Sequence, residues 1–219
     1  MGDVIPEPVI QRLTEYLVHI RGLRERGVEW VLSQEVAEAL ALTSSTVRQD
    51  LSHLDFSGVS KRGYETEKLE VALRAALGAD EQVNVVLVGV GNLGRALALH
   101  GELERRGFIM CGVFDSDEHL VGRKIGSLNV LPMSDLKSIV RKRRVELGLI
   151  AVPGSAAQEV GDRLVEAGVK GLLNLTPAHV HAPEDVSVVD ARIVACLQEL
   201  LYFVRTRRPG EPNRRQYGK

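Results

Sequence analysis

Apolar positions follow two different spacings along the chain. Up to about residue 80 they recur every three or four positions, as at Ile10, Leu13, Leu17 and Ile20, which is one face of a helix. From residue 83 onward, short continuous apolar runs rich in β-branched residues alternate with helical stretches. Such runs are typical of strands buried on both faces of a parallel sheet. The pattern therefore predicts a helical domain over residues 1–80 and an α/β domain over 81–190.

The N-terminal domain is expected to contain four helices, over 5–27, 31–42, 45–56 and 66–78. Ser33 and Thr66 are the expected N-caps of the second and fourth helices. The second and third helices are separated by a turn of three to four residues, which is helix-turn-helix spacing. Val47, Leu51 and Leu54 form the predicted buried stripe of the third helix.

The opposite side of the third helix carries small hydrogen-bonding residues and one arginine. In a major groove, arginine pairs with guanine and glutamine with adenine. A glycine-punctuated basic stretch at 57–64 is expected to form a hairpin, or wing, that contacts phosphates or the minor groove. A solvated face of an ordinary helical bundle fits the same pattern, and acidic residues outnumber lysine and arginine over 1–80. The candidate DNA-contacting residues are Ser45, Thr46, Arg48, Gln49, Ser52, His53, Lys61 and Arg62.

A glycine-rich turn follows the first predicted strand of the α/β domain, in VNVVLVGVGNLGRAL at 83–97. Gly89 permits the tight turn, Gly91 lets the backbone approach a pyrophosphate, and Gly94 lets the helix pack closely on the strand. This spacing predicts a dinucleotide-binding loop that consists of Gly89, Val90, Gly91, Asn92, Leu93 and Gly94.

Asp115 ends a second predicted strand over 108–117, at 21 residues past Gly94. A carboxylate at about this distance accepts a hydrogen bond from a ribose 2′-hydroxyl and repels a 2′-phosphate. This arrangement favours NAD(H) over NADP(H). The alternative interpretation is that Asp115 only opens a turn.

Two further strands are expected over 146–153 and 169–177, with a helix over 155–168 between them and Ser155 as its N-cap. Ligands of doubly wound sheets lie across the carboxyl ends of the strands. The nicotinamide half is therefore expected at Ala151, Val152, Pro153, Asn174, Leu175, Thr176 and Pro177.

The last predicted helix, over 191–208, is apolar on more than one stripe. A terminal helix that cannot bury all these side chains on its own sheet is expected to bury them against a second copy, which predicts a homodimer. The alternative is that the helix packs on its own domain. Residues 209–219 are polar and rich in basic residues, and we expect them to be disordered.

The composition and motifs of the 219 residues argue against a generally cationic protein, a membrane-spanning protein and a metal site. The formal net charge is −1, so the surface is not generally cationic. Cys111 and Cys196 are expected to be buried free thiols of a cytoplasmic protein, and no apolar run approaches the ~20 residues of a membrane span. His179 and His181 have no recognised metal-ligand spacing, and the sequence contains neither a G-x-S-x-G nor an H-E-x-x-H motif. The basic run at 141–144 ends an amphipathic helix, where cations suit the dipole.

Several segments together resemble the Rex family of redox-sensing transcriptional repressors: STVRQDLSHL, KRGY, VGVGNLGRAL, FDSD followed by VGRKIG, AVPGSAAQEVGDRLVEAGVKGLLNLTPA, and LQELLYF. The resemblance runs from about residue 5 to 206. It implies a winged-helix domain joined to a Rossmann-like doubly wound parallel sheet, and a homodimer whose last helix exchanges between subunits. It also implies that NADH releases the protein from a palindromic operator.

The chain departs from the family pattern at three places. Gln49 stands where the family usually has a second basic residue, and the segment after the third helix is about two residues longer. Arg192 stands where the family often has an aspartate linked to the switch, with Asp190 two residues earlier.

We expect no enzymatic activity. A small NAD-dependent oxidoreductase of the same fold is the first alternative, but the expected strand ends offer no convincing general base. A regulatory protein that binds coenzyme A or another nucleotide is the second alternative, and Asp115 disfavours it.

Overall fold

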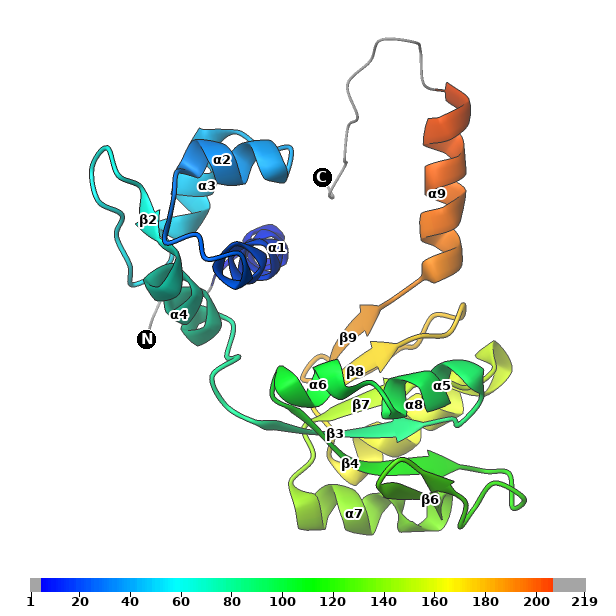
Figure 1. The fold of residues 1–219 in the computed structure, drawn as a ribbon. Helices are drawn as coiled ribbons and strands as arrows, with labels where there is room; N and C mark the ends of the chain where they lie inside the picture. Colours follow the sequence, from blue (N-terminus) through cyan, green and yellow to red (C-terminus); the bar gives the residue numbers. More distant parts are fainter. Residues whose placement is uncertain (1–4, 207–219) are drawn as a thin grey trace. The chain divides into compact units, whose positions relative to one another are not determined.

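The computed structural model describes residues 5–206 and divides into two compact units, one ending at Asp80 and the other beginning at Glu81 (Figure 1). Each unit has a hydrophobic core of its own. Within residues 5–206, no helix is long and apolar enough to cross a membrane.

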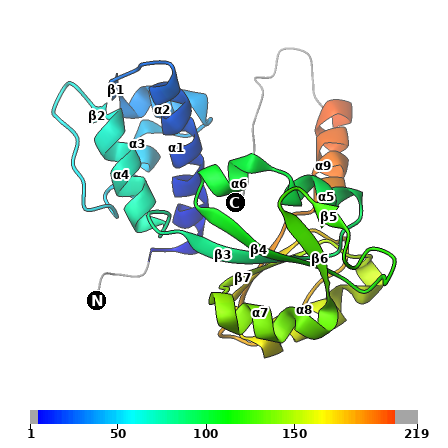
Figure 2. The same cartoon turned by 60° about the horizontal axis from the view of Figure 1, so that its bottom comes forward.

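The N-terminal unit is a four-helix domain with a short two-stranded sheet (Figure 2). Leu13, Ile20, Val47 and Leu73 form the centre of its core and are completely buried. The strands pair antiparallel, Trp30 opposite Glu65. The elements are α1 (Glu7–Glu25), β1 (Trp30–Val31), α2 (Ser33–Ala39), α3 (Ser44–Leu51), β2 (Tyr64–Glu65) and α4 (Thr66–Ala76).

The second unit is built on a seven-stranded sheet in the order β5-β6-β4-β3-β7-β8-β9, parallel except for the β5–β6 pair. From β3 the chain fills one side of the sheet and then crosses over to fill the other, which is the doubly wound arrangement. The strands are β3 (Val83–Val88), β4 (Phe108–Asp115), β5 (Lys124–Ile125), β6 (Leu128–Pro132), β7 (Leu147–Ile150), β8 (Gly171–Asn174) and β9 (Ser187–Asp190).

Helices cover both faces of this sheet. Along β3, Val86 and Val88 face the α7 and α8 side, whereas Val85 and Leu87 belong to the cluster on the α5 side. The alternation explains why the whole strand is apolar. The helices are α5 (Asn92–Ala98), α6 (Gly101–Arg105), α7 (Leu136–Arg143), α8 (Ala157–Ala167) and α9 (Ile193–Thr206), with single 3₁₀ turns at Met133–Asp135 and Gly154–Ala156.

Three predicted N-caps are wrong. Ser33 and Thr66 are the first residues of α2 and α4, and Ser155 lies in the 3₁₀ turn before α8. The Thr66 hydroxyl instead donates to the Val28 carbonyl oxygen at 2.7 Å, because the chain next to it pairs as a strand. The third helix also ends at Leu51, earlier than the predicted residue 56.

α9 buries none of its apolar side chains against its own unit. Between Ile193 and Thr206 no side chain is buried, so the alternative that this helix packs on its own domain is wrong for the structure of the single chain. Cys196 is therefore exposed and Cys111 is half-buried, which contradicts the expected buried thiols. The prediction of disorder for 209–219 lies outside the described residues.

Candidate functional site

The glycine turn after β3 has little room for side chains. Gly89 has a φ of +97°, and a Cβ there would stand 2.5 Å from the Ala151 carbonyl oxygen. A Cβ on Gly94 would collide with the carbonyl oxygen of Gly89. A Cβ on Gly91, by contrast, would meet no atom within 4 Å. Gly89 and Gly94 are thus required by packing within the protein, whereas Gly91 borders open space that a ligand could fill.

Asp115 holds this turn against the end of β4. Its Oδ2 accepts from the Val90 backbone N–H at 2.7 Å, and its Oδ1 accepts from the Asp117 N–H at 3.0 Å. The second bond is the turn contact of the alternative interpretation. Asp115 is only half-buried, so one side of the carboxylate also borders the space in front of the turn.

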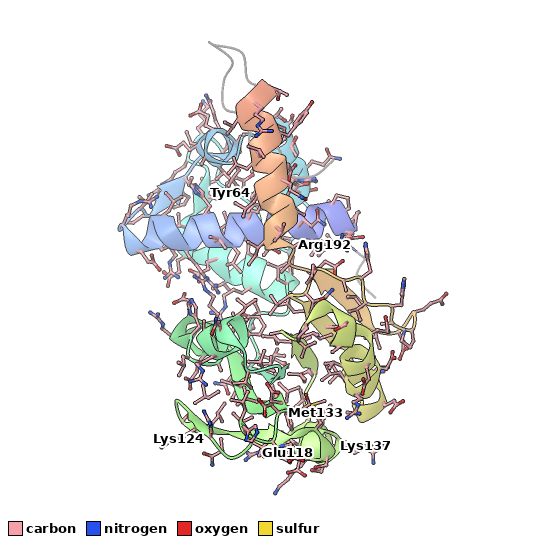
Figure 3. The ribbon with its side chains drawn as sticks, turned by 90° about the vertical axis from the view of Figure 1, so that its right-hand side faces the viewer. Tyr64, Glu118, Lys124, Met133, Lys137 and Arg192 are labelled. Atoms are coloured by element: carbon pink, nitrogen blue, oxygen red, sulfur yellow. The ribbon has the colours of Figure 1, made fainter. Side chains whose placement is uncertain are left out.

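A cavity of about 430 Å³ lies at the carboxyl ends of β3, β4 and β7. Of the predicted cofactor residues, seven line it: Gly89, Val90, Gly91, Asp115, Ala151, Val152 and Pro153. Its other apolar walls are Val121, Pro132, Met133 and Val160, and charged side chains at the cavity are Glu118, Glu159 and Arg163. Figure 3 labels Glu118 and Met133, which lie at the same end of this unit. The walls suit a flat apolar group such as a purine, next to a carboxylate that can accept from a sugar hydroxyl.

The remaining predicted cofactor residues do not line this cavity. Asn174 and Thr176 are 0% and 3% exposed, and their polar groups bond within the protein. Asn174 Nδ2 donates to the Ala178 carbonyl oxygen at 2.7 Å, and Asn174 Oδ1 accepts from the Thr176 N–H at 3.0 Å. These two residues shape the turn after β8. The cavity also lacks Asn92, Leu93, Gly94, Leu175 and Pro177.

Sequence reasoning missed the walls contributed by β6 and α8. Pro132 ends the run LNVLP, which is a strand beside β4, and Met133 follows it directly. This run could have been recognised from the sequence as a strand next to β4. Parallel strands end at the same edge of the sheet, so its last residues would then be expected at the cavity.

The polar face of α3 consists of Ser45, Arg48, Gln49 and Ser52, all of them exposed, as is His53 just beyond the helix. The predicted stripe of Val47, Leu51 and Leu54 is buried beneath it. Arg48 donates to the Ser33 hydroxyl at 3.2 Å, which ties this face to the start of α2.

Thr46 has a different position from the rest of this set. It is half-buried, and its hydroxyl lies 2.8 Å from that of Thr43. Thr43 is the N-cap of α3, since its hydroxyl accepts from the Thr46 N–H at 3.1 Å.

Asp50 is a buried residue of α3 that the sequence analysis did not single out. It is 2% exposed and accepts from Arg12 Nε at 2.6 Å, from Arg12 Nη2 at 2.7 Å and from the Tyr16 hydroxyl at 2.6 Å. Burial, with the hydrogen bond to Asp50, raises the pKa of Tyr16 above its ordinary value, so the hydroxyl stays a donor. The burial of Asp50 could have been predicted from helical spacing, because position 50 lies on the same side of the helix as Val47 and Leu54.

The predicted wing is a tight turn closed by one bridge between Val59 and Gly63. Lys61 and Arg62 are exposed at its tip, and Lys61 has a left-handed φ of +62°. The Arg62 guanidinium stacks on the Trp30 ring, 3.9 Å from its centroid. Trp30, a further residue that sequence reasoning missed, thus orients one of the two wing cations.

Two family models match separate parts of the chain. Residues 4–52 match the family described as putative DNA-binding protein N-terminus, and residues 80–178 match the CoA binding domain. The redox-sensing transcriptional repressor Rex of Carboxydothermus hydrogenoformans is 39% identical over 204 residues, which cover 93% of this chain and 98% of the relative. Rex 1 of Thermotoga maritima is 38% identical over 205 residues, with coverages of 93% and 98%. The chain belongs to the Rex family.

Solved Rex-family structures share the fold over nearly the whole chain. The crystal structure of RSP, a Rex-family repressor, matches with a TM-score of 0.84 at 30% identity and covers 92% of this chain and 94% of RSP. RSP in complex with β-NAD⁺ and operator DNA matches with a TM-score of 0.86 at 31% identity, with coverages of 92% and 93%. The predicted family and fold class are confirmed, and the curated relatives are transcriptional repressors rather than enzymes.

In this Rex chain, the residues just before α9 form a charged cluster. Asp190 accepts from Asn174 Nδ2 at 2.7 Å and pairs with Arg192, whose Nη2 lies 2.7 Å from His179 Nδ1. The hydrogen bond from Asn174, together with the pairing to Arg192, holds the pKa of Asp190 below its ordinary value. Asp190 is thus an ionised anchor at the end of β9, and Arg192 pairs with it. Figure 3 shows Arg192 at the base of α9.

Proposed function

We propose that this Rex protein binds operator DNA through α3 and its wing, and that NADH bound at the glycine turn lowers its affinity for DNA. The observation that carries this proposal is the fold match to RSP, a repressor crystallised both with β-NADH and with β-NAD⁺ and operator DNA. The family's redox-sensing role requires two conformations, one with low and one with high affinity for DNA. NADH must bind the conformation with low DNA affinity more tightly, because a ligand shifts an equilibrium only by its difference in affinity for the two states.

The proposed dinucleotide site is the cavity at the carboxyl ends of β3, β4 and β7. The adenine would lie between Val121, Met133 and Val160. Val121 lies in the turn region after β4, Met133 in the 3₁₀ turn after β6, and Val160 in α8. The pyrophosphate would approach the backbone at Gly91, where no side chain intervenes. Asp115 would accept from the adenosine ribose while it keeps its bond to the Val90 N–H. Asn92, Leu93, Gly94 and 174–177 would then act by shaping the turns around the ligand.

The proposed DNA surface is the polar face of α3 with His53 and the wing. Arg48 and Gln49 would contact base edges, and Ser45, Ser52 and His53 would contact bases or phosphates. Lys61 and Arg62 would contact the backbone or the minor groove. Thr46 would act mainly by bonding to Thr43, the N-cap of α3, through its N–H and hydroxyl.

A second copy of the chain is the proposed partner of α9. Ile193, Val194, Leu197 and Leu200 each expose more than half of their surface, as do Tyr202 and Val204. Exposed apolar faces of this size are characteristic of interfaces. A two-fold dimer presents two α3 helices, so its operator would be an inverted repeat with half-sites about one or more helical turns apart. A repressor of this kind would act in the cytoplasm, where DNA and NADH are both present.

An operator mobility shift titrated with NADH tests the proposal. We expect NADH at micromolar concentrations to release the DNA and NAD⁺ to compete with it. Equal operator affinity with and without saturating NADH would contradict the sensing role, and failure to bind any inverted repeat would contradict the DNA-binding role.

Coenzyme A is the second candidate ligand, because residues 80–178 match the CoA binding domain. The carboxylates of Asp115, Glu118 and Glu159 at the cavity disfavour the additional phosphate of coenzyme A. Calorimetric titration with NADH and with coenzyme A separates the two, and we expect heat of binding only with NADH.

A further inference from the structure

The cations of the N-terminal unit differ in the kind of partner that holds them. Five are paired with carboxylates, which cancels charge that would otherwise attract phosphates. The paired cations are Arg12, Arg21, Arg24, Lys68 and Arg74. On the proposed DNA surface, Arg48 is held by the Ser33 hydroxyl instead. Arg62 is held by the Trp30 ring. A neutral partner orients a cation and leaves its charge available for DNA.

The backbone fixes the wing next to Trp30. The Val59 N–H donates to the Gly63 carbonyl oxygen at 2.7 Å, and the Arg62 N–H donates to the Val59 carbonyl oxygen at 3.1 Å. Gly63 has a φ of +87°, and a Cβ there would stand 2.3 Å from the Val31 carbonyl oxygen. Trp30 and Val31 form β1, so this close approach brings the end of the wing against the strand that carries the ring. The backbone thus holds Arg62 and Trp30 within reach of each other.

The stacking leaves the hydrogen-bonding edges of Arg62 open. The carbon at the centre of its guanidinium lies 3.9 Å from the centroid of the Trp30 ring, so the ring covers one face of this planar group. The N–H donors lie in the plane of the guanidinium and not on its face. Glu65, which is opposite Trp30 in the β1–β2 pair, forms its ion pair with Lys68 at 2.6 Å. Arg62 is exposed and can therefore donate to an anion while it stays on the ring.

A phosphate is the DNA group that fits this geometry. An arginine fork binds two phosphate oxygens through one edge, which the stacking leaves open. To reach a base edge in the minor groove, the guanidinium would have to enter a space about 6 Å wide. Stacked planar groups lie about 3.5–4.0 Å apart at contact, so the guanidinium and the indole together are thicker than this groove. Arg62 could enter the groove only by leaving Trp30.

We propose that Trp30 is a positioning residue of the DNA surface, which holds the Arg62 guanidinium ready to bind a DNA phosphate. This inference rests on the proposed operator binding through α3 and the wing. Because the Arg62 side chain is ordered before DNA arrives, less conformational entropy is lost when the contact forms. Trp30 therefore adds affinity without adding charge, and a phosphate contact adds it without sequence preference.

A double-mutant cycle on the full-length protein tests this role. The variants are Trp30→Leu, Arg62→Gln and the combination of both, with Trp30→Phe as the conservative control. We expect Trp30→Leu to weaken operator binding about two- to fivefold for each wing, which is the strength of an exposed cation–π contact. Trp30→Phe keeps an aromatic face and should keep most of the affinity. In the Arg62→Gln protein, Trp30→Leu should cause no further loss.

The salt dependence of binding separates orientation from charge. Affinity is measured between 50 and 200 mM salt, on the operator and on unrelated DNA. Arg62→Gln should lower the slope of log K against log salt by about 0.9 for each wing, because one phosphate contact is lost. Trp30→Leu keeps the cation, so its slope should equal that of the unaltered chain. Both variants should lose affinity equally on the two kinds of DNA.

A second measurement uses the unaltered side chain of Trp30, the single tryptophan. If Arg62 stays on the ring while it binds a phosphate, operator binding should reduce the quenching of Trp30 fluorescence by acrylamide. Arg62→Gln should abolish this reduction. Equal protection of Trp30 in the Arg62→Gln protein would show that DNA itself covers the ring, which overturns the inference even where Trp30→Leu fails to fold.

The other outcomes separate this inference from the proposed function. Full operator affinity in Trp30→Leu overturns the inference and leaves operator binding intact. An equal effect of Trp30→Leu with and without Arg62 also overturns it, because Trp30 would then act on the fold alone. A loss confined to the operator would identify a base contact and contradict the phosphate contact. Failure of the unaltered chain to bind the operator overturns both. Thermal unfolding followed by circular dichroism, expected to match the unaltered chain, shows that each variant is folded.

Discussion

Asp50 occupies the buried side of α3, directly after the exposed residues Arg48 and Gln49. Its carboxylate joins α3 to α1 through the Arg12 guanidinium and the Tyr16 hydroxyl. Removal of one member of a buried ion pair leaves the other charge without a partner and costs about 3–5 kcal/mol. Asp50 therefore fixes the helix whose opposite face we propose to contact DNA.

We expect Asp50→Ala to lower the free energy of unfolding of the N-terminal unit by about 3 kcal/mol, because Arg12 and Tyr16 lose their shared acceptor. Urea denaturation followed by the fluorescence of Trp30, the single tryptophan, measures this unit. Asp55→Ala, at an exposed neighbouring position, should change the same quantity by no more than about 0.5 kcal/mol. Equal effects of the two substitutions would show that the buried pair does not stabilise the unit.

Asp115 combines a structural bond with a proposed contact to the ligand, and two substitutions separate these roles. Asp115→Asn keeps an oxygen that can accept from the Val90 N–H, whereas Asp115→Ala removes it. We expect both variants to bind NADH about tenfold or more weakly, since each loses a charged acceptor. Because Asp115→Asn keeps the bond to the Val90 N–H, the loss in this variant belongs to the ligand contact. Operator affinity without nucleotide should stay unchanged. Calorimetry and mobility shifts measure the two affinities, and NADH affinity retained in both variants would remove Asp115 from the proposed site.

At the scale of elements, α3 has two sides with different roles. Its apolar side packs in the core, and its polar side is the surface that we propose contacts DNA. The apolar side of α3 packs against α2 and α1, and its N-cap Thr43 sets where the helix begins. Arg48 is tied to α2 through Ser33, so the two helices of the helix-turn-helix position its guanidinium together. A side chain held in this way can form a directional contact with a base edge.

We expect Arg48→Ala to weaken operator binding by about 1–3 kcal/mol and to relax the preference at one base pair. Arg48→Lys is the matched control, because lysine keeps the charge but lacks the planar fork that binds guanine with two hydrogen bonds. Mobility shifts on the operator and on single-base variants measure both effects. Recovery of full affinity in the lysine variant would identify a phosphate contact and contradict the base contact.

At the scale of the whole molecule, α9 is an apolar helix with no buried side chain in the single chain. The cluster of Asn174, Asp190 and Arg192 anchors its base to the sheet that forms the proposed nucleotide site. A conformational change at the carboxyl ends of the strands, where we propose that the nucleotide binds, would thus be transmitted to α9. This is the helix that we propose forms the dimer interface.

We expect Leu197→Glu to convert the dimer to monomers, because a charge in an apolar interface loses its hydration. Gln198→Glu adds the same charge at the next position, where the native side chain is already polar, and should leave the dimer intact. Sedimentation equilibrium measures the mass, and mobility shifts should show weaker operator binding for the Leu197 variant. A monomeric unaltered chain, or a dimeric Leu197 variant, would contradict the proposed interface.

The sequence by itself determined the features that depend on neighbours in the chain. The stripe of Val47, Leu51 and Leu54 follows from helical spacing, and the strand Val83–Val88 follows from an apolar run that ends in glycine. The turn at Gly89 and Gly94 could be predicted because it needs positive φ and close packing within a few residues. These features identified the fold class and three of the predicted cofactor residues that line the cavity, Gly89, Val90 and Gly91.

Only the tertiary structure decided which distant residues meet. Asp50 finds Arg12 and Tyr16 across a helix contact, and Pro132 and Met133 reach the cavity because β6 lies beside β4. Asn174 was predicted to face the ligand, yet the turn after β8 and the pairing with β9 provide partners for its side chain within the protein. Local periodicity sets the direction in which a side chain points, but its partner is set by the packing of elements that are remote in sequence.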